Sequence, residues 1–368
     1  MNRITVAVLY GGRSTEHSVS CVSAGAVMAH LDRSVYEVIP VGITASGTWT
    51  LGPDDVSDLQ IVNRSMPVVD PHRPRVALGL STDDRGVLRF VDGDSAGEEI
   101  ARVDVVFPVM HGTHAEDGTI QGLLELSGVP YVGPGVFASA AGMDKEFTKV
   151  VLGAAGLPIG QQVVLRPGTE TLTAADRERL GLPLFVKPAR GGSSIGITKV
   201  SRAEELDAAI AEARRFDDKV IVESAIVGRE VECGVLEYPD GRVEASQPAE
   251  LHIPGEPTGV EGETEGVAFY DFDTKYLDDV TTFDLPADLP GAESDRLREM
   301  AVDAFHALDA RGLSRVDFFV TADGPVINEV NTMPGFTPIS MYPQMWAASG
   351  VDYPTLLDTL LRTALVRD

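Results

Sequence analysis

The amino-acid sequence predicts an α/β amino-terminal region followed by α+β regions built on antiparallel sheets. In the first third, the apolar runs 4–10, 36–43 and 103–110 alternate with segments of helical character near 20–29 and 119–127. Such alternation predicts a parallel sheet covered by helices. Further along, the strand-like runs 182–188, 219–224, 229–236 and 315–320 follow one another without regular crossover helices, which favours antiparallel pairing.

Two boundaries divide the chain where this pattern changes. They fall near Pro134 and Glu223, and the expected domains are 1–133, 134–223 and 224–368. Residues 45–100 break the strand-helix rhythm and are expected to form a loop-rich insertion. Residues 255–283 are rich in glycine and glutamate without helical periodicity, which predicts a long mobile loop of the kind that closes over an active site.

The composition indicates a globular chain that does not bind nucleic acid or membrane. Apolar residues make up 43% of the 368 positions, enough for substantial cores. The net charge is -26, with 30 basic against 56 acidic residues, whereas nucleic acid and anionic lipid both require a basic surface. An anionic ligand would therefore need locally clustered cations.

The two cysteines and the amino terminus favour a cytoplasmic protein. Cys21 and Cys233 lie far apart and have no metal-ligand spacing, so we interpret them as reduced thiols; a secreted protein with one disulfide is the alternative. The first apolar run ends in Gly-Gly-Arg-Ser rather than in a small-residue cleavage site, which indicates a buried strand. The sequence has no apolar run of 18 residues that would span a bilayer.

Residues 314–331 predict a β-hairpin with charged side chains on one face. A three-residue connection, 322–324, is a common hairpin loop. The register then follows as Thr321 opposite Pro325, Asp317 opposite Glu329, and Arg315 opposite Asn331. Because side chains alternate along a strand, the last four of these project from the same side of the sheet.

The two opposed carboxylates of this hairpin indicate a cation site. Asp317 and Glu329 would repel each other unless a cation lies between them. Oxygen ligands with room for water are what Mg²⁺ prefers, usually completed by substrate phosphates. The alternative is a solvated polar face with Arg315 as counter-ion.

Further cations and a glycine-rich segment would suit the phosphates. Lys145 opens a predicted helix, and Lys187 ends an apolar strand, where a charge rarely occurs without a partner. The segment 189–196, Ala-Arg-Gly-Gly-Ser-Ser-Ile-Gly, offers backbone N–H groups and hydroxyls to a phosphate. The sequence contains neither of the two commonest nucleotide motifs, Walker A and G-x-G-x-x-G.

The glycine turn after the first strand marks a second part of the site. Gly11 and Gly12 stand at the carboxyl end of a strand, where open α/β sheets bind ligands. Glu16 there either holds a substrate ammonium or is an ordinary first-turn helix acid. His111 follows another strand at the same edge, so a role facing the substrate is expected. His111 and His114 are spaced like zinc ligands, but no third ligand is apparent.

Taken together, these motifs resemble the D-alanine:D-alanine ligase family of the ATP-grasp superfamily over essentially the whole chain. They are GGRSTEHSVS from residue 11, HGTHAEDGTIQGLLE from 111, MDK from 143, VKPARGGSSIG from 186, YDFDTKY from 270, RVDFF from 315 and NEVNTMPGFT from 328. The resemblance implies an ATP-grasp fold of three domains: a parallel-sheet amino-terminal domain for substrate, and two antiparallel-sheet α+β domains that clamp ATP.

For ATP, the resemblance implies contacts from the second and third domains. The phosphates would be bound by Lys145, Lys187, Ser193 and Ser194, and Asn328 is a further implied contact with ATP. The adenosine would lie near Glu223, Glu230 and the backbone of Ile226. Ala225 stands where the family often has a large aromatic residue, so Phe269 or Phe318 would supply that contact.

For the metals and the amino acids, the resemblance implies the following assignments. Asp317, Glu329 and Asn331 would hold two Mg²⁺ ions, with Mn²⁺ as a substitute. The backbone N–H of Gly335 and the guanidinium of Arg315 would form the oxyanion hole. Glu16 would bind the ammonium of the first D-alanine in a network with Ser193 and Tyr276. The second substrate would contact Lys275 and Ser340, and the remaining implied substrate contacts are His111 and Met341.

The implied activity is the ATP-dependent ligation of two D-alanines, for peptidoglycan precursors, by a cytoplasmic homodimer joined through its amino-terminal domains. A carboxylate does not react with an amine directly, so a D-alanyl phosphate would form first. Relatives that join D-alanine to D-lactate lack the Lys-Tyr pair present here as Lys275 and Tyr276, which favours an amine acceptor. A different ATP-grasp carboxylate-amine ligase and an inactive ATP-binding regulator are the competing interpretations.

Overall fold

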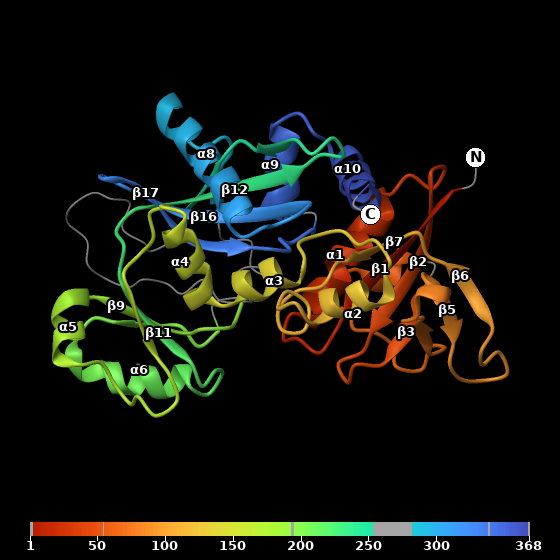
Figure 1. Cartoon of the computed structure of the whole chain (residues 1–368), viewed down its shortest axis with the longest axis horizontal. Helices are drawn as coiled ribbons and strands as arrows, with labels where there is room; N and C mark the ends of the chain where they lie inside the picture. The colour runs from red at the N-terminus through yellow and green to blue at the C-terminus, as the bar shows by residue number, and fades with distance from the viewer. Residues whose placement is uncertain (1–2, 54, 193–194, 253–281, 338, 367–368) are drawn as a thin grey trace.

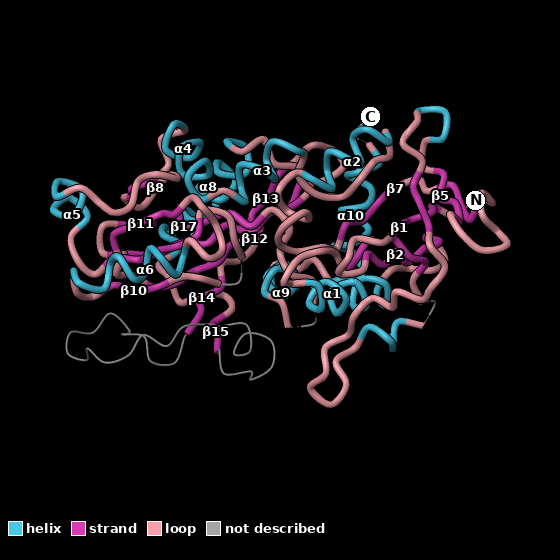
Figure 2. Tube along the Cα trace, turned by 90° about the horizontal axis from the view of Figure 1, so that it is seen from below, coloured by secondary structure: helices cyan, strands magenta, loops and turns pink. Residues whose placement is uncertain are grey.

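The computed structural model describes residues 3–53, 55–192, 195–252, 282–337 and 339–366. The amino-terminal elements, red to orange in Figure 1, lie at one end of the long axis. At the other end, the green elements of the middle of the chain lie beside the blue carboxyl-terminal sheet (Figure 1). Figure 2 shows the same division from below, with strands in magenta.

The amino-terminal sheet is mostly parallel, as predicted. Its strand order is β3 (Trp49–Leu51), β2 (Tyr36–Ile43), β1 (Ile4–Gly11) and β7 (Val105–Pro108). β1 pairs in parallel with β2 and β7, whereas β3 runs antiparallel to β2. Helices α1 (His17–His30) and α2 (Thr119–Ser127) follow β1 and β7 along the chain, so both expected helices are confirmed. Residues 129–133 contribute a single bridge to this sheet, between Tyr131 and Val106.

Residues 45–100 are rich in loops, as the sequence predicts, but they also hold short elements that the sequence did not predict. They contain the short 3₁₀ turns 56–59 and 82–84, and β4 (Val76–Leu78) and β5 (Val87–Phe90), which form an antiparallel sheet with β6 (Glu99–Arg102). Val76 and Leu88 share a hydrophobic cluster with Ala7 and Leu9 of β1. Strands of three or four residues show little periodicity, and burial against the main sheet supplies the stability that their sequence does not reveal.

The central sheet is antiparallel, as predicted. Its order is β10 (Thr198–Val200), β9 (Leu184–Pro188), β11 (Val220–Ser224) and β8 (Gln162–Leu165). Leu180 of α5 (Ala174–Leu180) and Ile210 of α6 (Leu206–Ala213) pack into one hydrophobic cluster with Val186 and Val222 of the sheet. A 3₁₀ turn, 203–205, leads into α6.

The carboxyl-terminal sheet is also antiparallel. Its main order is β15 (Thr282–Asp284), β14 (Ala249–His252), β12 (Arg229–Glu237), β16 (Leu313–Thr321) and β17 (Gly324–Asn331), and β13 (Val243–Ala245) pairs with β12. Its core also includes side chains of α8 (Gly291–Ala307), and of α3 (Val136–Met143) and α4 (Lys145–Ala154), which precede the central sheet in sequence.

The β16–β17 hairpin has the predicted charged pairs but reaches them differently. Thr321 pairs with Gly324 rather than with Pro325, so the connection has two residues instead of three. A bulge then shifts the register: Phe318 pairs with Ile327, and Asp317 pairs with Glu329, which leaves Asn328 as the extra residue. The bulge compensates for the shorter turn, and the predicted pairs Asp317–Glu329 and Arg315–Asn331 are confirmed.

The last two helices share a hydrophobic core with elements from the beginning of the chain. α9 (Met341–Ala348) follows the hairpin, and α10 (Tyr353–Leu365) packs on the amino-terminal sheet. Leu357 and Leu361 of α10 belong to the same core as Val6 and Phe107. None of the helices in the described residues is both long and apolar enough to span a membrane.

Candidate active site

A cavity of about 490 Å³ lies where the amino-terminal, central and carboxyl-terminal groups of elements meet. Its lining comes from the segments after β1 and β7, from the glycine-rich segment after β9, and from the β16–β17 hairpin and the residues after it. The predicted site residues that line it are Glu16, His111, Lys145, Lys187, Arg315, Asn328, Glu329, Asn331, Gly335, Ser340 and Met341.

A cluster on β12 and the β16–β17 hairpin, which we call the acidic wall, is formed by Glu232, Arg315, Asp317, Glu329 and Asn331, and all of these except Asp317 contribute to the described cavity lining. Asp317 lies directly across from Glu329 on β17 and from Glu232 on β12. Arg315 donates from Nε and Nη2 to the two oxygens of Asp317, at 2.7 Å each, and Nη2 lies 3.2 Å from Glu232 Oε1. Asn331 Nδ2 donates to Asp317 Oδ2 at 2.9 Å.

The guanidinium in the acidic wall is permanently charged. Burial opposes the charge, but Asp317 and Glu232 outweigh that effect and raise the pKa of Arg315 well above its usual value. The wall nevertheless contains three carboxylates and one guanidinium, so it carries an excess of negative charge.

A second cluster, which we call the basic wall, is formed by Lys149, Lys187 and Glu223, and of these Lys187 lines the cavity. Lys187 on β9 and Glu223 on β11 are joined at 2.8 Å, and Lys149 on α4 donates to the second oxygen of Glu223. Only 12% of the Lys187 side chain and 4% of the Lys149 side chain are exposed. This wall therefore buries two ammonium groups against one carboxylate.

The pKa values of the basic wall follow from this shared carboxylate. Burial disfavours the ionised form of Glu223, but the attraction of Lys187 and Lys149 is stronger and lowers its pKa to about 2. Burial also disfavours charge on Lys187, yet Glu223 raises the pKa of that lysine. For Lys149, burial prevails and lowers the pKa.

Lys145 connects the two walls. It is the first residue of α4, whose N-cap Asp144 accepts from the backbone N–H of Glu146 at 3.1 Å. Lys145 Nζ donates to the carbonyl oxygen of Gly191 at 2.9 Å and lies 3.8 Å from Glu329 Oε2. It thus lies between the glycine-rich segment and the acidic wall.

Glu16 is held close to two glycines. It precedes α1, and a Cβ atom added to Gly112 or to Gly192 would lie 2.6 Å or 3.0 Å from its Oε2 atom. Gly112 also has a φ of 74°, a backbone conformation that favours glycine. These close approaches bring the segments after β1, β7 and β9 together around one carboxylate.

Glu116 is a second acid at this end of the cavity. It accepts from the backbone N–H groups of Gly112, at 2.7 Å, and Met333, at 3.2 Å. Burial and the neighbouring charge of Glu16 raise its pKa, although the two N–H donors act in the opposite direction. A cationic ligand between the two acids would relieve this repulsion.

His111 is buried, and both of its ring nitrogens contact the protein. Nδ1 lies 3.2 Å from the carbonyl oxygen of Met333, and Nε2 lies 3.2 Å from Ser23 Oγ on α1. The ring therefore joins α1 to the segment after β17, while it also lines the cavity.

Glycine is needed at position 335 because of the neighbouring Ser340 side chain rather than because of its backbone angle. Its φ is outside the left-handed range, but an added Cβ would lie 2.7 Å from Ser340 Oγ. Ser340 in turn accepts from the N–H of Thr337 at 3.0 Å. The tight turn holds both residues at the cavity wall.

Other predicted residues are not gathered at the cavity. Glu223 lies behind Lys187 in the basic wall, and Glu230 shares the face of β12 with Glu232 and contributes to the raised pKa of Lys187. Ile226 lies in the connection from β11 to β12, and Phe318 is buried in the carboxyl-terminal core; neither contributes to the described cavity lining. Ser193, Ser194, Phe269, Lys275 and Tyr276 lie outside the described residues.

Three residues of the site were not predicted from the sequence. Lys149 lies four positions after Lys145 on one helix, and two lysines at this spacing repel each other, which is a signal that each has an anionic partner elsewhere. Glu116 belongs to the motif from residue 111, the end of which was interpreted as a turn. Glu232 carries no local signal, because its contact with Arg315 depends on the pairing of β12 with β16.

The acidic wall fits a divalent cation. The carboxylates of Asp317 and Glu329 face each other on adjacent strands with Asn331 beside them, and Glu329 and Asn331 line the cavity. Carboxylate and amide oxygens are the ligands of Mg²⁺ and Mn²⁺. The basic wall and Lys145 would suit a polyphosphate that shares these cations.

Two family models match the chain. Residues 5–134 match the model described as D-ala D-ala ligase N-terminus, and residues 151–362 match the one described as D-ala D-ala ligase C-terminus. A curated protein from Rhodococcus erythropolis, named D-alanine--D-alanine ligase, is 63% identical over 366 residues, which cover 100% of this chain and 98% of that protein. One of the same name from Mycolicibacterium smegmatis is 58% identical and covers 99% of this chain and 96% of its own length.

Solved structures agree with these sequence matches. The VanG D-Ala:D-Ser ligase from Enterococcus faecalis is 34% identical with a TM-score of 0.82 and covers 99% of this chain and 100% of that one. The D-alanine-D-alanine ligase from Coxiella burnetii is 33% identical with a TM-score of 0.82 and covers 100% of this chain and 95% of that one.

Proposed function

Because the chain belongs to the D-alanine–D-alanine ligase family, we propose that it joins two D-alanines into a dipeptide with consumption of ATP. The observation that carries this proposal is one cavity whose lining combines Lys145 and Lys187 with Glu329 and Asn331 of the acidic wall. One wall suits divalent cations and the other suits phosphates, which is the pair of surfaces that phosphoryl transfer requires.

The first step activates a carboxylate. An amine does not displace oxide from a carboxylate, so the first D-alanine attacks the γ-phosphorus of ATP through its carboxylate oxygen and releases ADP. Lys145 and Lys187 neutralise the charge on the transferred phosphoryl group. Asp317, Glu329 and Asn331 would hold two Mg²⁺ ions, with Mn²⁺ as a substitute, which supply further positive charge to the phosphates.

The second step forms the peptide bond. The amine of the second D-alanine attacks the acyl carbon, and phosphate leaves. Arg315 and the N–H of Gly335 stabilise the tetrahedral oxyanion, a contribution typically worth about 10²–10³ in rate per donor. Glu16 binds the ammonium of the first D-alanine, with Glu116 as a second acid nearby. Exclusion of water protects the acyl phosphate.

Several finer assignments belong to the same proposal. Ser193, Ser194 and Asn328 contact the phosphates, and Glu223, Glu230, Ile226 and Phe269 surround the adenosine. The second D-alanine meets Lys275, Ser340 and Met341, with Tyr276 and His111 beside the substrates. The protein is a cytoplasmic homodimer with domain limits 1–133, 134–223 and 224–368, which sedimentation and limited proteolysis would test.

Product analysis tests the proposed acceptor. ADP release is measured with D-alanine alone and with D-alanine plus D-lactate or D-serine, at pH 6 and 8, and the products are separated by mass. We expect D-alanyl-D-alanine as the main product at both pH values. Dominant turnover of D-lactate or D-serine would instead assign the chain to a relative with a different acceptor, and ATP binding without turnover would assign it to a regulator.

A further inference from the structure

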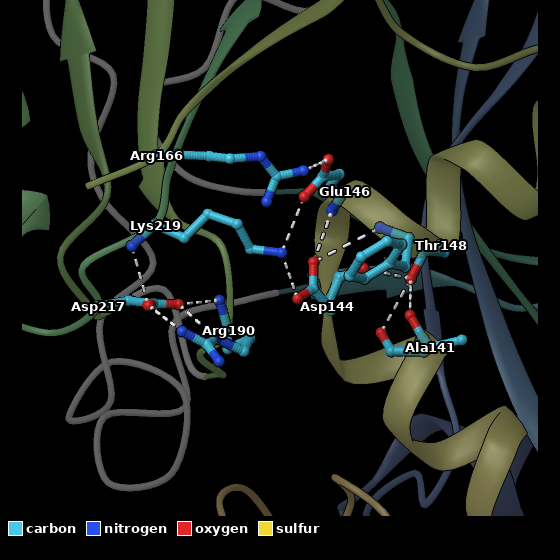
Figure 3. Close-up of polar contacts among 10 residues, drawn as sticks. Ala141, Asp144, Glu146, Thr148, Arg166, Arg190, Asp217 and Lys219 are labelled. Carbon is cyan, nitrogen blue, oxygen red and sulfur yellow. Dashed lines mark hydrogen bonds and ion pairs between the residues drawn. The ribbon is translucent and has the colours of Figure 1, made fainter. Parts of the chain in front are cut away.

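A buried ion cluster joins the first turn of α4 to the central sheet (Figure 3). Lys219 Nζ lies 2.5 Å from Asp144 Oδ2 and 2.9 Å from Glu146 Oε2, and the exposed fractions of the three side chains are 8%, 8% and 11%. The ammonium also lies 4.6 Å from the centre of the Phe147 ring. Lys219 therefore neutralises two carboxylates that water hardly reaches.

The two carboxylates flank Lys145 in sequence. Asp144 caps α4, and Glu146 lies in its first turn, where it also contacts Arg166 at 2.5 Å. The ion pairs of Asp144 and Glu146 therefore fix the backbone on both sides of Lys145. The side chain of Lys145 points away from the cluster and donates to the carbonyl of Gly191 in the cavity. Lys219 thus fixes the backbone from which Lys145 projects, without contacting the cavity.

Backbone hydrogen bonds run parallel to the ion pairs. The N–H of Lys145 donates to the carbonyl of Ala189, and the N–H of Ala189 donates to the carbonyl of Lys219, both at 2.9 Å. Lys219 directly precedes β11, whose Ile221 pairs with Lys187 on β9. The two lysines that face the phosphates therefore start from backbones that Lys219 holds together.

A second ion pair supports the same turn. Arg190 donates from Nε and Nη2 to the two oxygens of Asp217, at 3.0 Å and 2.6 Å (Figure 3). Asp217 also accepts from the backbone N–H of Lys219 at 3.0 Å. The turn before β11 is thus anchored to the start of the glycine-rich segment as well as to α4.

We propose that Lys219 is a positioning residue for phosphoryl transfer: its ion pairs with Asp144 and Glu146 hold Lys145 in register with Lys187. The inference rests on the proposed role of Lys145 as a phosphate ligand. Loss of the Lys219 charge leaves two buried acids that repel each other across the helix start, so the first turn of α4 shifts. A displacement of about 1 Å at such a distance from the reacting atoms is sufficient to cost about 10²-fold in rate.

The test compares Lys219→Met with Lys219→Arg in the full-length protein. We expect Lys219→Met to raise KM for ATP and to lower kcat, with about a 10²-fold loss of kcat/KM for ATP, and to leave KM for D-alanine unchanged. Lys219→Arg, which keeps the charge, restores most of the loss. A merely structural role would lower the amount of folded enzyme without a change in KM for ATP.

Two further variants keep the test decisive. Arg298→Met is the matched control, because Arg298 donates to the carbonyl of Ala245 in the carboxyl-terminal domain, away from the cavity; it is expected to lower stability without a change in KM for ATP. If Lys219→Met does not fold, Lys219→Met with Asp144→Asn removes the carboxylate that loses its ion pair, while asparagine still caps α4 and Glu146 keeps Arg166, and we expect stable protein that still has the raised KM for ATP.

The failure of this inference is distinguishable from that of the proposed function. Folded Lys219→Met with unchanged KM for ATP and kcat, beside an impaired Lys145→Met, would overturn the role of Lys219 alone. Full activity of Lys145→Met would overturn the proposed role of Lys145, and with it the basis of the inference.

Discussion

The acidic wall and the basic wall differ in the sign of their excess charge. The acidic wall on β12, β16 and β17 holds three carboxylates around Arg315, whereas the basic wall on α4, β9 and β11 holds two lysines around Glu223. Each wall keeps one central ion of the opposite sign and an excess of its own. The comparison shows how a protein of net charge -26 can bind a polyanion. It places a few buried lysines close together, and its acidic wall can bind metal cations that add further positive charge.

The largest expected effect is on the central ion of the basic wall. Glu223→Gln leaves Lys149 and Lys187 buried without an anion, so we expect a loss of about 3–5 kcal/mol of unfolding free energy at pH 7. Urea denaturation measures it. Glu178→Gln on the exposed side of α5 is the control, with a change within about 0.5 kcal/mol.

The pH dependence of the same variant sharpens this prediction. The pKa of Glu223 is lowered to about 2 in the folded protein, so its contribution is present above the unfolded pKa of about 4.5 and is lost as the pH falls towards 2. The stability difference between wild type and variant is therefore expected to narrow between pH 5 and pH 3. A constant difference would show that the two lysines do not depend on this carboxylate.

In the acidic wall, Glu329→Gln is expected to separate activity from stability. It removes one of two opposed carboxylates, so the free protein is at least as stable, since like charges across strands repel. The activity falls by about 10²–10³-fold, and the concentration of Mg²⁺ needed for half-maximal rate rises. Steady-state ADP release over a Mg²⁺ titration checks both effects, and an unchanged Mg²⁺ requirement would contradict a cation site here.

Lys187→Met removes a phosphate-facing charge from the basic wall. We expect about a 10²-fold loss of kcat/KM for ATP, because a donor to the transferred group is lost. The KM for D-alanine is expected to change little, since Glu16 belongs to the segment after β1 and not to the basic wall. An equal effect on both substrates would indicate a general disturbance of the cavity instead.

The smallest effect is expected for Lys149→Met. Glu223 keeps its contact with Lys187 at 2.8 Å, so only one of its two ion pairs is lost, with a cost of about 1.5 kcal/mol. The KM for ATP is expected to change less than in Lys187→Met, because Lys149 does not contribute to the described cavity lining. If Lys149→Met impaired ATP use as strongly as Lys187→Met, the two lysines would share the phosphate.

The sequence was sufficient for the hairpin residues of the acidic wall, but not for Glu232 or for the contacts within the basic wall. Side chains on a hairpin alternate and oppose by rule, so Asp317 and Glu329 could be paired from local spacing, even though the turn was one residue shorter and a bulge at Asn328 restored the register. Lys149 and Glu223 lie 74 positions apart on elements that meet only through tertiary packing, and local spacing holds no information about such a contact.

Elements of the fold could likewise be predicted where they depend on the local sequence, but not where they depend on contacts with distant residues. Alternation of long apolar strands with helices predicted the parallel sheet, because each element buries a continuous apolar surface. The small sheet of β4, β5 and β6 was missed, because its strands gain their apolar partners from β1 rather than from their own pattern. The motifs from residues 11, 111, 143, 186, 315 and 328 identified most of the predicted residues that line the cavity, but they contained no indication that Lys219 supports the backbone of Lys145.

The packing of α10 on the first sheet has a consequence for biosynthesis. A ribosome makes β1, α1 and β7 long before it makes Leu357 and Leu361, and Tyr36 on β2 is likewise made long before Asp358, whose carboxylate accepts from its hydroxyl at 2.7 Å. The nascent amino-terminal domain therefore leaves the exit tunnel before α10 has covered the apolar surface of its sheet. Its maturation is completed only after translation has reached the last helix.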